Sequence, residues 1–277
     1  MAEYIIQDTT LMGIADSIRA KTGKTDSIPV PDMRSQIDSI PSGGDDETLK
    51  EIMNRSITKI TIPDGATQVC NYLFDSCKGL ETVYFHDYIT NIGEYAFRNC
   101  NKLNFERLPD ELLEIGVCAF FGCTGLEISE LPDGLKTIGR QAFTYCKKLA
   151  ISKLPSGLTS LGYQAFYGCE NITITSIPAG ITKFVDGEFR GCTKLALTHF
   201  ESTVESLGFY CFAFCTGLTN ITFKGTPSAI SSNAFNNCDN LTTINVPWSE
   251  GEVANAPWGA TNATINYNYT EAIQNAD

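Results

Sequence analysis

Cysteine is the residue type in this sequence with the widest choice of chemistry. The chain of 277 residues holds eleven cysteines, and eight of them follow one another at a constant interval of 23 residues. These eight are Cys77, Cys100, Cys123, Cys146, Cys169, Cys192, Cys215 and Cys238. A zinc site needs four ligands converging at short spacing, and no CxxC pair occurs. Identical disulfides between successive members would be unusual geometry. We therefore expect free, buried thiols that pack as small apolar side chains.

The other chemistry-bearing residue types give no catalytic pattern. Only two histidines are present, His86 and His199, and a Ser–His–Asp or Cys–His site would have to use one of them. Neither accompanies a G-x-S-x-G nucleophile turn, and both are predicted to be surface residues. The phosphate-binding patterns G-x-x-x-x-G-K-[ST] and G-x-G-x-x-G are missing. The sequence predicts no catalytic residue, no metal ligand and no cofactor.

Charge and hydropathy narrow the classes of partner and the location. The net charge is −12, so nucleic acid and bare anionic membranes should be repelled. No apolar run is long enough for a transmembrane helix, and the N-terminus lacks the basic and apolar regions of a secretory signal peptide. The protein therefore either stays in the cytoplasm where it is made, leaves by another route such as a virus particle, or has lost an N-terminal segment.

Phenylalanine repeats at the same interval as cysteine, and this points to stacked coils. The eight positions are Phe74, Phe97, Phe120, Phe143, Phe166, Phe189, Phe212 and Phe235. Further apolar columns keep the same register without an insertion, beginning at Ile57, Ile62 and Val69. A unit this short cannot bury its own apolar side chains, so each coil must cover the core of its neighbour. We expect a parallel ladder rising about 4.8 Å per coil. A stack of buried phenylalanine rings should be its main stabiliser, at roughly 1.5–3 kcal/mol per ring.

Within one unit, Leu126–Leu131 is predicted to be a strand that Pro132 ends, and Ile138-Gly139 a turn. Coils at the two ends of the array place an apolar residue three positions after the first leucine or isoleucine, whereas the middle coils place it two positions after. This difference predicts a local change in the path of the strand.

At these residues the sequence resembles a known family. The unit L-P-x-x-L-x-x-I-G-x-x-A-F-x-x-C is similar to the BspA-like class of bacterial leucine-rich repeats, most closely in Leu131–Cys146 and Leu154–Cys169. The resemblance covers Ile57 to Pro247. It implies a right-handed leucine-rich-repeat solenoid of parallel strands, turns and short helical segments, used for adhesion or protein contact and without catalysis.

The repeat is interrupted most clearly in the sixth coil. Val185 stands where most coils have glycine, as at Gly162, and Glu188 where most have alanine, as at Ala165; we call these positions the glycine and alanine columns. Cys211 and Ser231 are milder departures in the next two coils. Either sequence drift or a kink with a functional role would explain the pair in the sixth coil.

The two ends of the chain lie outside the repeat. We divide the sequence into an attachment segment with its linker (1–46), an N-terminal cap (47–56), the solenoid (57–250) and a C-terminal cap with its tail (251–277). Residues 1–40 predict two short amphipathic helices, and their I-A-D-x-I-R-x-K-T-G core resembles tail- and fibre-associated proteins of Firmicutes phages and prophages. That resemblance implies virion attachment or self-association. Trp258 should cover the last apolar layer, the alternative being a ligand pocket formed by Trp248 and Trp258.

Function in a solenoid usually resides in exposed columns that vary while the core repeats. Aromatic residues and arginine are favoured contact anchors, and aromatic rings also suit stacking against sugars. The candidate contact surface comprises Phe121, Arg140, Tyr145, Tyr163, Tyr167, Arg190, Phe209 and Phe214. The alternative is that these are ordinary surface residues.

Three functions remain open from the sequence. The first is a non-enzymatic recognition or adhesion module that presents an extended surface to a protein or glycan, on a phage tail or a bacterial surface. The second is a structural spacer or virion decoration protein without a ligand. The third is a polysaccharide hydrolase, which would need paired carboxyl groups in a cleft that an uninterrupted solenoid does not offer.

Overall fold

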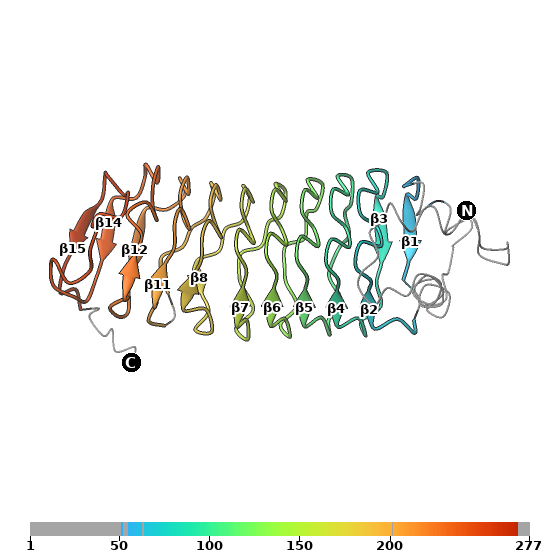
Figure 1. Ribbon diagram of the computed structural model, residues 1–277, viewed down its shortest axis with the longest axis horizontal. Coiled ribbons are helices and arrows are strands. Elements are labelled where there is room, and N and C mark those ends of the chain that lie inside the picture. The colour runs from blue at the N-terminus through green and yellow to red at the C-terminus, as the bar shows by residue number, and fades with distance from the viewer. Residues whose placement is uncertain (1–50, 52–54, 63, 201, 271–277) are drawn as a thin grey trace, which may run out of the picture.

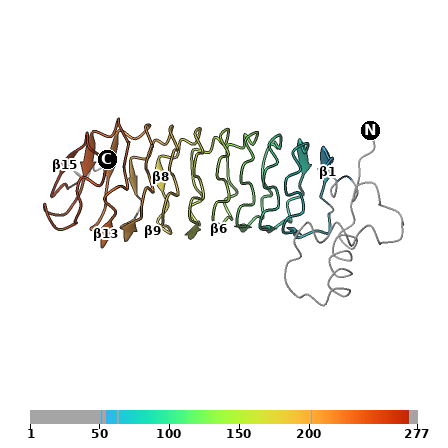
Figure 2. The same ribbon diagram turned by 45° about the horizontal axis from the view of Figure 1, so that its top comes forward.

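The computed structural model describes residues 51, 55–62, 64–200 and 202–270. The chain winds into a row of coils stacked along one long axis, with β1 and β15 at opposite ends (Figure 1). The view turned by 45° shows the same regular spacing of coils (Figure 2). The predicted leucine-rich-repeat solenoid is therefore confirmed. The short helical segments expected inside the coils are turns, because every regular element within 55–62, 64–200 and 202–270 is a strand.

The strands fall into two columns along the solenoid, one near the start and one near the middle of each unit. The first column contains β1 (Lys59–Thr61), β3 (Thr82–Tyr84), β8 (Ser176–Ile177), β10 (His199–Phe200), β12 (Asn220–Thr222), β14 (Thr243–Asn245) and β15 (Thr264–Asn266). The second contains β2 (Gln68–Val69), β4 (Asn91–Ile92), β5 (Glu114–Ile115), β6 (Thr137–Ile138), β7 (Ser160–Leu161), β9 (Lys183–Phe184), β11 (Ser206–Leu207) and β13 (Ala229–Ile230).

All strand pairing is parallel, and it follows the 23-residue repeat except between β14 and β15, whose paired residues are 21 apart. In the second column, for example, Gln68 pairs with Asn91 and Glu114 with Thr137. Each coil thus lies directly on its predecessor, and residues of one column share one face.

The strand predicted at Leu126–Leu131 is wrong. No strand is formed there, and the fourth coil instead contributes β6, at the place predicted to be a turn. In Leu126–Leu131 the alternation of buried and exposed side chains fails, because Ser129 and Glu130 are both exposed. At β6 the ladder runs on past Ile138, since the Gly139 N–H donates to the Ile115 carbonyl at 2.7 Å.

The predicted change of strand path is confirmed. The coils with an apolar residue three positions on form three-residue strands around it, as β1 does around Ile60 and β3 around Val83. In the middle coils no strand of the first column forms around Phe105, Ile128 and Ile151, and in the coils of Ile174 and Leu197 the strands β8 and β10 begin two residues later.

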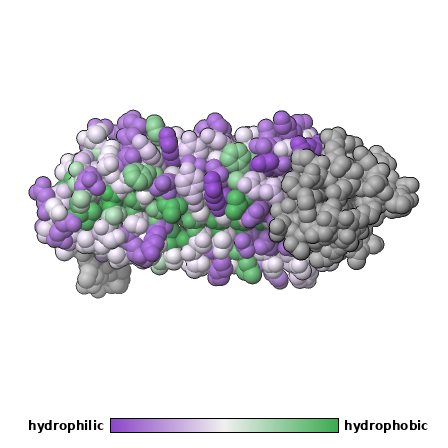
Figure 3. Space-filling view, viewed as in Figure 1, coloured by the Kyte–Doolittle hydropathy of each residue, from purple (hydrophilic) through white to green (hydrophobic). Residues whose placement is uncertain are grey.

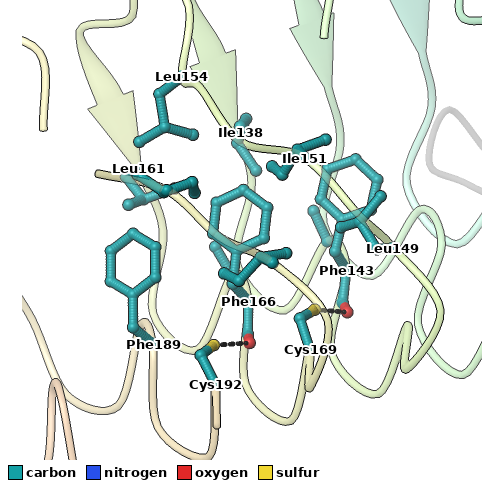
Figure 4. Close-up of a cluster of buried hydrophobic side chains, with 14 of the residues drawn as sticks. Ile138, Phe143, Leu149, Ile151, Leu154, Leu161, Phe166, Cys169, Phe189 and Cys192 are labelled. Atoms are coloured by element: carbon teal, nitrogen blue, oxygen red, sulfur yellow. Dashed lines mark hydrogen bonds between the residues drawn. The ribbon is translucent and has the colours of Figure 1, made fainter. Parts of the chain in front are cut away.

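A single stack of phenylalanine rings runs through the core. All eight ladder phenylalanines are fully buried, and successive ring centroids lie 5.2–5.5 Å apart. Interplanar angles between 0° and 18° show that the rings are nearly parallel. The spacing slightly exceeds the strand separation of about 4.8 Å, as offset stacking requires. Figure 4 shows Phe143, Phe166 and Phe189 in this arrangement.

The ladder cysteines are tied to this stack by hydrogen bonds. Each thiol from Cys100 to Cys238 donates to the carbonyl oxygen of the ladder phenylalanine in the preceding coil, at 3.0–3.1 Å. Figure 4 shows two of these bonds, from Cys169 to Phe143 and from Cys192 to Phe166. None of the described cysteines forms a disulfide. They therefore do more than fill space, because each also links two coils.

The C-terminal end is closed by a further coil. Strand β15 pairs with β14 and extends the first column, so the coiled path continues past residue 250. Trp258 is fully buried, and its carbonyl accepts the Phe235 N–H at 2.9 Å. Trp248 is 2% exposed and meets Trp258 edge to face at 6.2 Å. Both indoles are thus buried and in contact at this end of the solenoid.

The ladder of the second column is interrupted once, between β7 and β9. In the glycine column a Cβ on Gly162 would lie 2.4 Å from the backbone nitrogen of Arg140, so a side chain here requires the two coils to shift. The small Ser231 is accommodated in this column, with β11 and β13 still paired. Val185 occupies the same column one coil later and is 45% exposed. The branched valine side chain is bulkier than serine, and the strand pairing between the fifth and sixth coils is lost here. We call this break, between β7 and β9, the seam.

The predictions for residues 1–40 and the linker lie outside the described residues. Of the predicted cap at 47–56, the structure describes Glu51, Arg55 and Ser56.

Candidate functional site

Each coil bends sharply on both sides of its ladder phenylalanine. In the first seven coils the backbone has a positive φ two positions before and two after that ring, for example 54° at Gln164 and 70° at Gly168 around Phe166. Around Phe235, in the eighth coil, only the later position, Asn237, has one. These two left-handed bends leave the ring inside and place the residues around it on the outer face of the turn.

The candidate residues differ in exposure. Phe209 is 57% exposed, Tyr145 41%, Phe214 40% and Tyr163 36%. Arg140 is also exposed, whereas Phe121, Tyr167 and Arg190 are half-buried. Phe121, Tyr167 and Arg190 are half-buried because neighbouring surface side chains cover part of each.

Five of the eight candidates form one chain of contacts. Phe121 and Tyr145 meet edge to face at 5.9 Å, and Tyr145 and Tyr167 at 5.2 Å. The guanidinium of Arg190 lies 5.6 Å from the Tyr167 ring and 5.3 Å from the Phe214 ring. We call these residues the contact strip. It runs from the third coil to the seventh and crosses the seam.

The other three candidates do not join the strip. Arg140 lies 5.3 Å above the Tyr163 ring, and this pair makes no ring contact with the strip among the described residues. The backbone N–H of Phe209 donates to a carboxylate oxygen of Asp186 at 2.8 Å. The ring of Phe209 is exposed.

Sequence reasoning missed Tyr210. Its ring lies 5.0 Å from the Arg190 guanidinium, so three rings surround this cation. Tyr210 is two positions before its ladder phenylalanine, in a column that was not considered. The recurrence of tyrosine in that column, at Tyr72 and Tyr95, is the sequence signal that could have found it. In the structure those two rings stack at 4.7 Å.

Two strip residues occupy backbone positions suited to glycine. Tyr145 and Phe214 have φ of 62° and 60°, in the column that holds Gly122, Gly168 and Gly191 elsewhere. A side chain in this left-handed region costs on the order of 1–3 kcal/mol. The Tyr145 ring leans over the next coil, where a Cβ on Gly168 would lie 2.8 Å from it. The strip is therefore kept at the expense of backbone strain.

The family follows from the repeat that builds this surface. The model of the BspA type leucine-rich repeat region matches residues 50–173 and 114–242. The chain belongs to the BspA-type leucine-rich-repeat family. No curated protein sequence matches it.

Two solved leucine-rich-repeat structures are similar to this chain. A leucine-rich-repeat protein of T. pallidum is 31% identical, with a TM-score of 0.51 over 58% of this chain and 77% of its own. A leucine-rich-repeat protein of Bacteroides ovatus is 23% identical, with a TM-score of 0.49 over 76% of this chain and 69% of its own. The similarity is one of fold.

Beneath the strip, the seam of this BspA-type solenoid buries an acid. Glu188 is fully buried, and one of its carboxylate oxygens accepts the N–H of Val185, which has lost its partner in the fifth coil. The other oxygen has no hydrogen-bond partner among the described residues. Burial raises the pKa of Glu188 to about 8. Near neutral pH the side chain is therefore largely protonated.

The seam stays closed on the side of the strip. The Phe166 N–H donates to the Glu188 carbonyl at 2.9 Å, and the Gly168 N–H to the Arg190 carbonyl at 2.8 Å. The interruption thus affects the strand side of the coils and leaves the strip continuous.

The histidines add no site to the BspA-type coils. His199, in β10, has its Nδ1 3.0 Å from the Thr198 hydroxyl. His86 was expected at the surface, but it is half-buried and neither ring nitrogen has a hydrogen-bond partner. Among the described residues there is no group of three or more metal-ligating side chains, and no helix long and apolar enough to cross a membrane.

The surface of the molecule is uneven in hydropathy. Figure 3 shows apolar residues gathered in a band along the long axis of one face, with hydrophilic residues on both sides. The exposed large apolar side chains include Tyr145, Val185, Phe209 and Phe214, all from the fourth to the seventh coil.

Proposed function

We propose that this protein is a non-enzymatic adhesion module that binds a protein partner through the contact strip. BspA-type leucine-rich repeats typically serve as binding modules. The finer assignment, to this surface and to a protein partner, is supported by the strip itself. The observation that supports the proposal is the unbroken chain of contacts from Phe121 to Phe214 on the outer turns.

Energetics favour a role for the strip beyond folding. Fifteen non-glycine residues among the described residues have a positive φ, and of these Tyr145 and Phe214 carry large exposed rings in a column that holds glycine in three other coils. Strain of this kind persists where a function requires the side chain. Tyrosine, phenylalanine and arginine, closely packed and partly exposed, are also typical anchors of protein interfaces.

We further propose that residues 1–40 attach the module to a larger assembly on a phage tail or a bacterial surface. This rests on the resemblance of their sequence and on the two amphipathic segments predicted there.

Binding to protein and glycan arrays tests the proposal. The full chain should bind members of the protein array, and Tyr145→Ala together with Phe214→Ala should remove most of that binding. Truncating interface anchors typically costs 2 kcal/mol or more each, which is at least about thirty-fold in affinity.

Tyr88→Ala is the matched control, because Tyr88 is 65% exposed and lies outside the strip. Binding that survives the double substitution would contradict the assignment to the strip. Glycan binding alone would replace the protein partner by a sugar, and silence on both arrays would favour a spacer without a ligand.

A further inference from the structure

We propose that Arg190 and the side chains around it form a carboxylate-binding site, which accepts an aspartate or glutamate side chain of the partner. The proposal rests on the proposed function, because it supplies the chemical specificity of the same surface.

Arg190 is held in place from several sides. The rings of Tyr167, Tyr210 and Phe214 lie 5.6, 5.0 and 5.3 Å from its guanidinium carbon, and its side chain is half-buried. Aromatic faces attract the cation without using its N–H groups as ordinary hydrogen-bond donors. A cation held in this way loses little conformational freedom when it binds a ligand.

Arg190 has no carboxylate partner within the described part of the chain. Among the described residues it forms no ion pair, whereas Arg55, Arg98 and Arg107 all pair with aspartate. Arg140 is the other described arginine without an ion pair, but it lies over a single ring, whereas three rings surround Arg190. Its planar fork of donors matches a carboxylate.

The protein builds the expected complex elsewhere in the same column. Arg98 stands four coils before Arg190 at the equivalent position, and its guanidinium carbon lies 4.9 Å from the Tyr95 ring. Two of its N–H groups donate to the two carboxylate oxygens of Asp75, at 2.7 and 2.9 Å. Asp75 comes from the preceding coil.

At Arg190 the neighbouring coils offer Tyr167 and Ala213 in that column, and neither carries a charge. Arg190 thus has the aromatic support of Arg98 without the acid. A carboxylate from outside would complete the arrangement that Asp75 completes at Arg98.

A second donor stands beside the guanidinium. The phenol groups of Tyr145 and Tyr167 share a hydrogen bond, which with burial raises the pKa of Tyr145, while the positive charge of Arg190 acts on it in the opposite direction. In such a pair one hydroxyl proton remains to be donated elsewhere. The other nearby cation, Lys147, is already paired with Glu170 at 2.8 Å.

The whole-molecule charge restricts the ligand further. A polyacidic partner or a doubly charged phosphate would be repelled by the net charge of −12. A single acidic side chain between uncharged residues meets Arg190 locally and leaves its neighbours to contact the exposed rings of Tyr145 and Phe214.

Selection from a random library of short peptides, with the full chain as the target, tests this site. Affinities of the selected peptides are then measured by fluorescence anisotropy. The peptides should contain one required aspartate or glutamate. Exchange of that residue for asparagine or glutamine should weaken binding about ten- to hundred-fold, the worth of a hydrogen bond to a charged group.

Arg190→Gln should produce the same loss, and the two changes together should lose little more than either one. Arg190→Lys, which keeps the charge but not the fork, should restore only part of the affinity. Arg140→Gln is the control, because Arg140 also lies over a tyrosine ring but is outside the strip. Circular dichroism of each variant checks that the solenoid is retained.

The outcomes separate the two proposals. Peptides whose binding needs Tyr145 but neither an acid nor Arg190 would overturn the carboxylate site and leave the contact strip. Arg190-dependent binding of acidic glycans, with no acidic peptide selected, would overturn the choice of a protein carboxylate. Failure to select any peptide, with silence on the protein array, would overturn both.

Discussion

At the scale of single residues, a ladder cysteine combines three properties. Its side chain is small enough for the space between coils, apolar enough for full burial, and able to donate one hydrogen bond to the preceding coil. Cys169 shows all three, because it is fully buried and donates to Phe143 at 3.0 Å. The acceptor already receives the Cys146 N–H at 2.9 Å, so the thiol bond is additional to the turn.

Exchange of Cys169 for serine and for alanine separates packing from hydrogen bonding. If the thiol bond to the Phe143 carbonyl contributes to stability, Cys169→Ser should be less destabilising than Cys169→Ala, by about 0.5–1.5 kcal/mol. The measurement is the free energy of unfolding in urea. A serine variant less stable than the alanine variant would mean that the cysteine acts only as an apolar filler.

At the scale of elements, one change of residue alters the relation between two coils. Val185 takes the place of a glycine whose backbone contacts the preceding coil, so β7 and β9 do not pair. The free Val185 N–H is then satisfied by Glu188, in a position that holds Ala165 in the fifth coil. The two departures in the sixth coil are therefore coupled, which favours a local kink over independent drift.

Stability should depend on pH through Glu188. Its pKa in the folded protein is about 8, above its ordinary value of 4.5, so the folded state binds the proton more tightly than the unfolded state. The contribution to stability is thus fully present below about pH 4.5 and is lost as the pH rises through about 8. The loss has a limiting slope of about 1.4 kcal/mol per pH unit.

The charged or titratable groups that act on Glu188 are few. The carboxylate of Asp186 raises the pKa of Glu188 further. Burial, and then the charge of Glu188, raise the pKa of the Cys211 thiol. Urea unfolding at a series of pH values should show the wild type losing stability relative to Glu188→Gln as the pH increases. Glutamine keeps an acceptor for the Val185 N–H and cannot ionise in this range. Parallel pH profiles for the two proteins would refute the buried, protonated acid.

At the scale of the whole molecule, the ends are the weak points of a solenoid. Each inner coil is covered on both sides, whereas the last layer needs a different cover. Trp258 supplies it with its fully buried ring, which contacts Trp248, and its indole N–H donates to the Ala254 carbonyl at 2.7 Å. The same stacking leaves a long outer surface, on which the contact strip spans five coils without an inserted loop.

Removal of the cap ring should open the C-terminal end. Trp258→Ala should lower the free energy of unfolding by about 3–5 kcal/mol, as expected for a buried tryptophan. It should also promote association through the exposed last layer, detectable by light scattering. Tyr269→Ala serves as the control, because Tyr269 is 37% exposed in the same region. A monomeric Trp258→Ala protein of unchanged stability would show that another part of the chain covers this end.

The periodic sequence by itself determined the stacking of coils and the identity of the inward columns. One lost residue would displace every later side chain from its column, so the regular spacing of phenylalanine and cysteine already requires that Phe143 lie between Phe120 and Phe166. The glycine column likewise marked Val185 as a departure. These conclusions need only the period, because every inner coil has the same environment.

Only the tertiary structure decided where each coil forms its strand, what the thiols bind and which surface residues meet. The ladder at Thr137–Ile138 depends on hydrogen bonds between neighbouring coils, and the Cys169 bond crosses to a carbonyl 26 residues away. Arg190 meets Tyr210 and Phe214 because left-handed bends turn these side chains from different columns toward one cation. The repeat period places residues in columns, but contacts between columns depend on backbone direction, which the period does not specify.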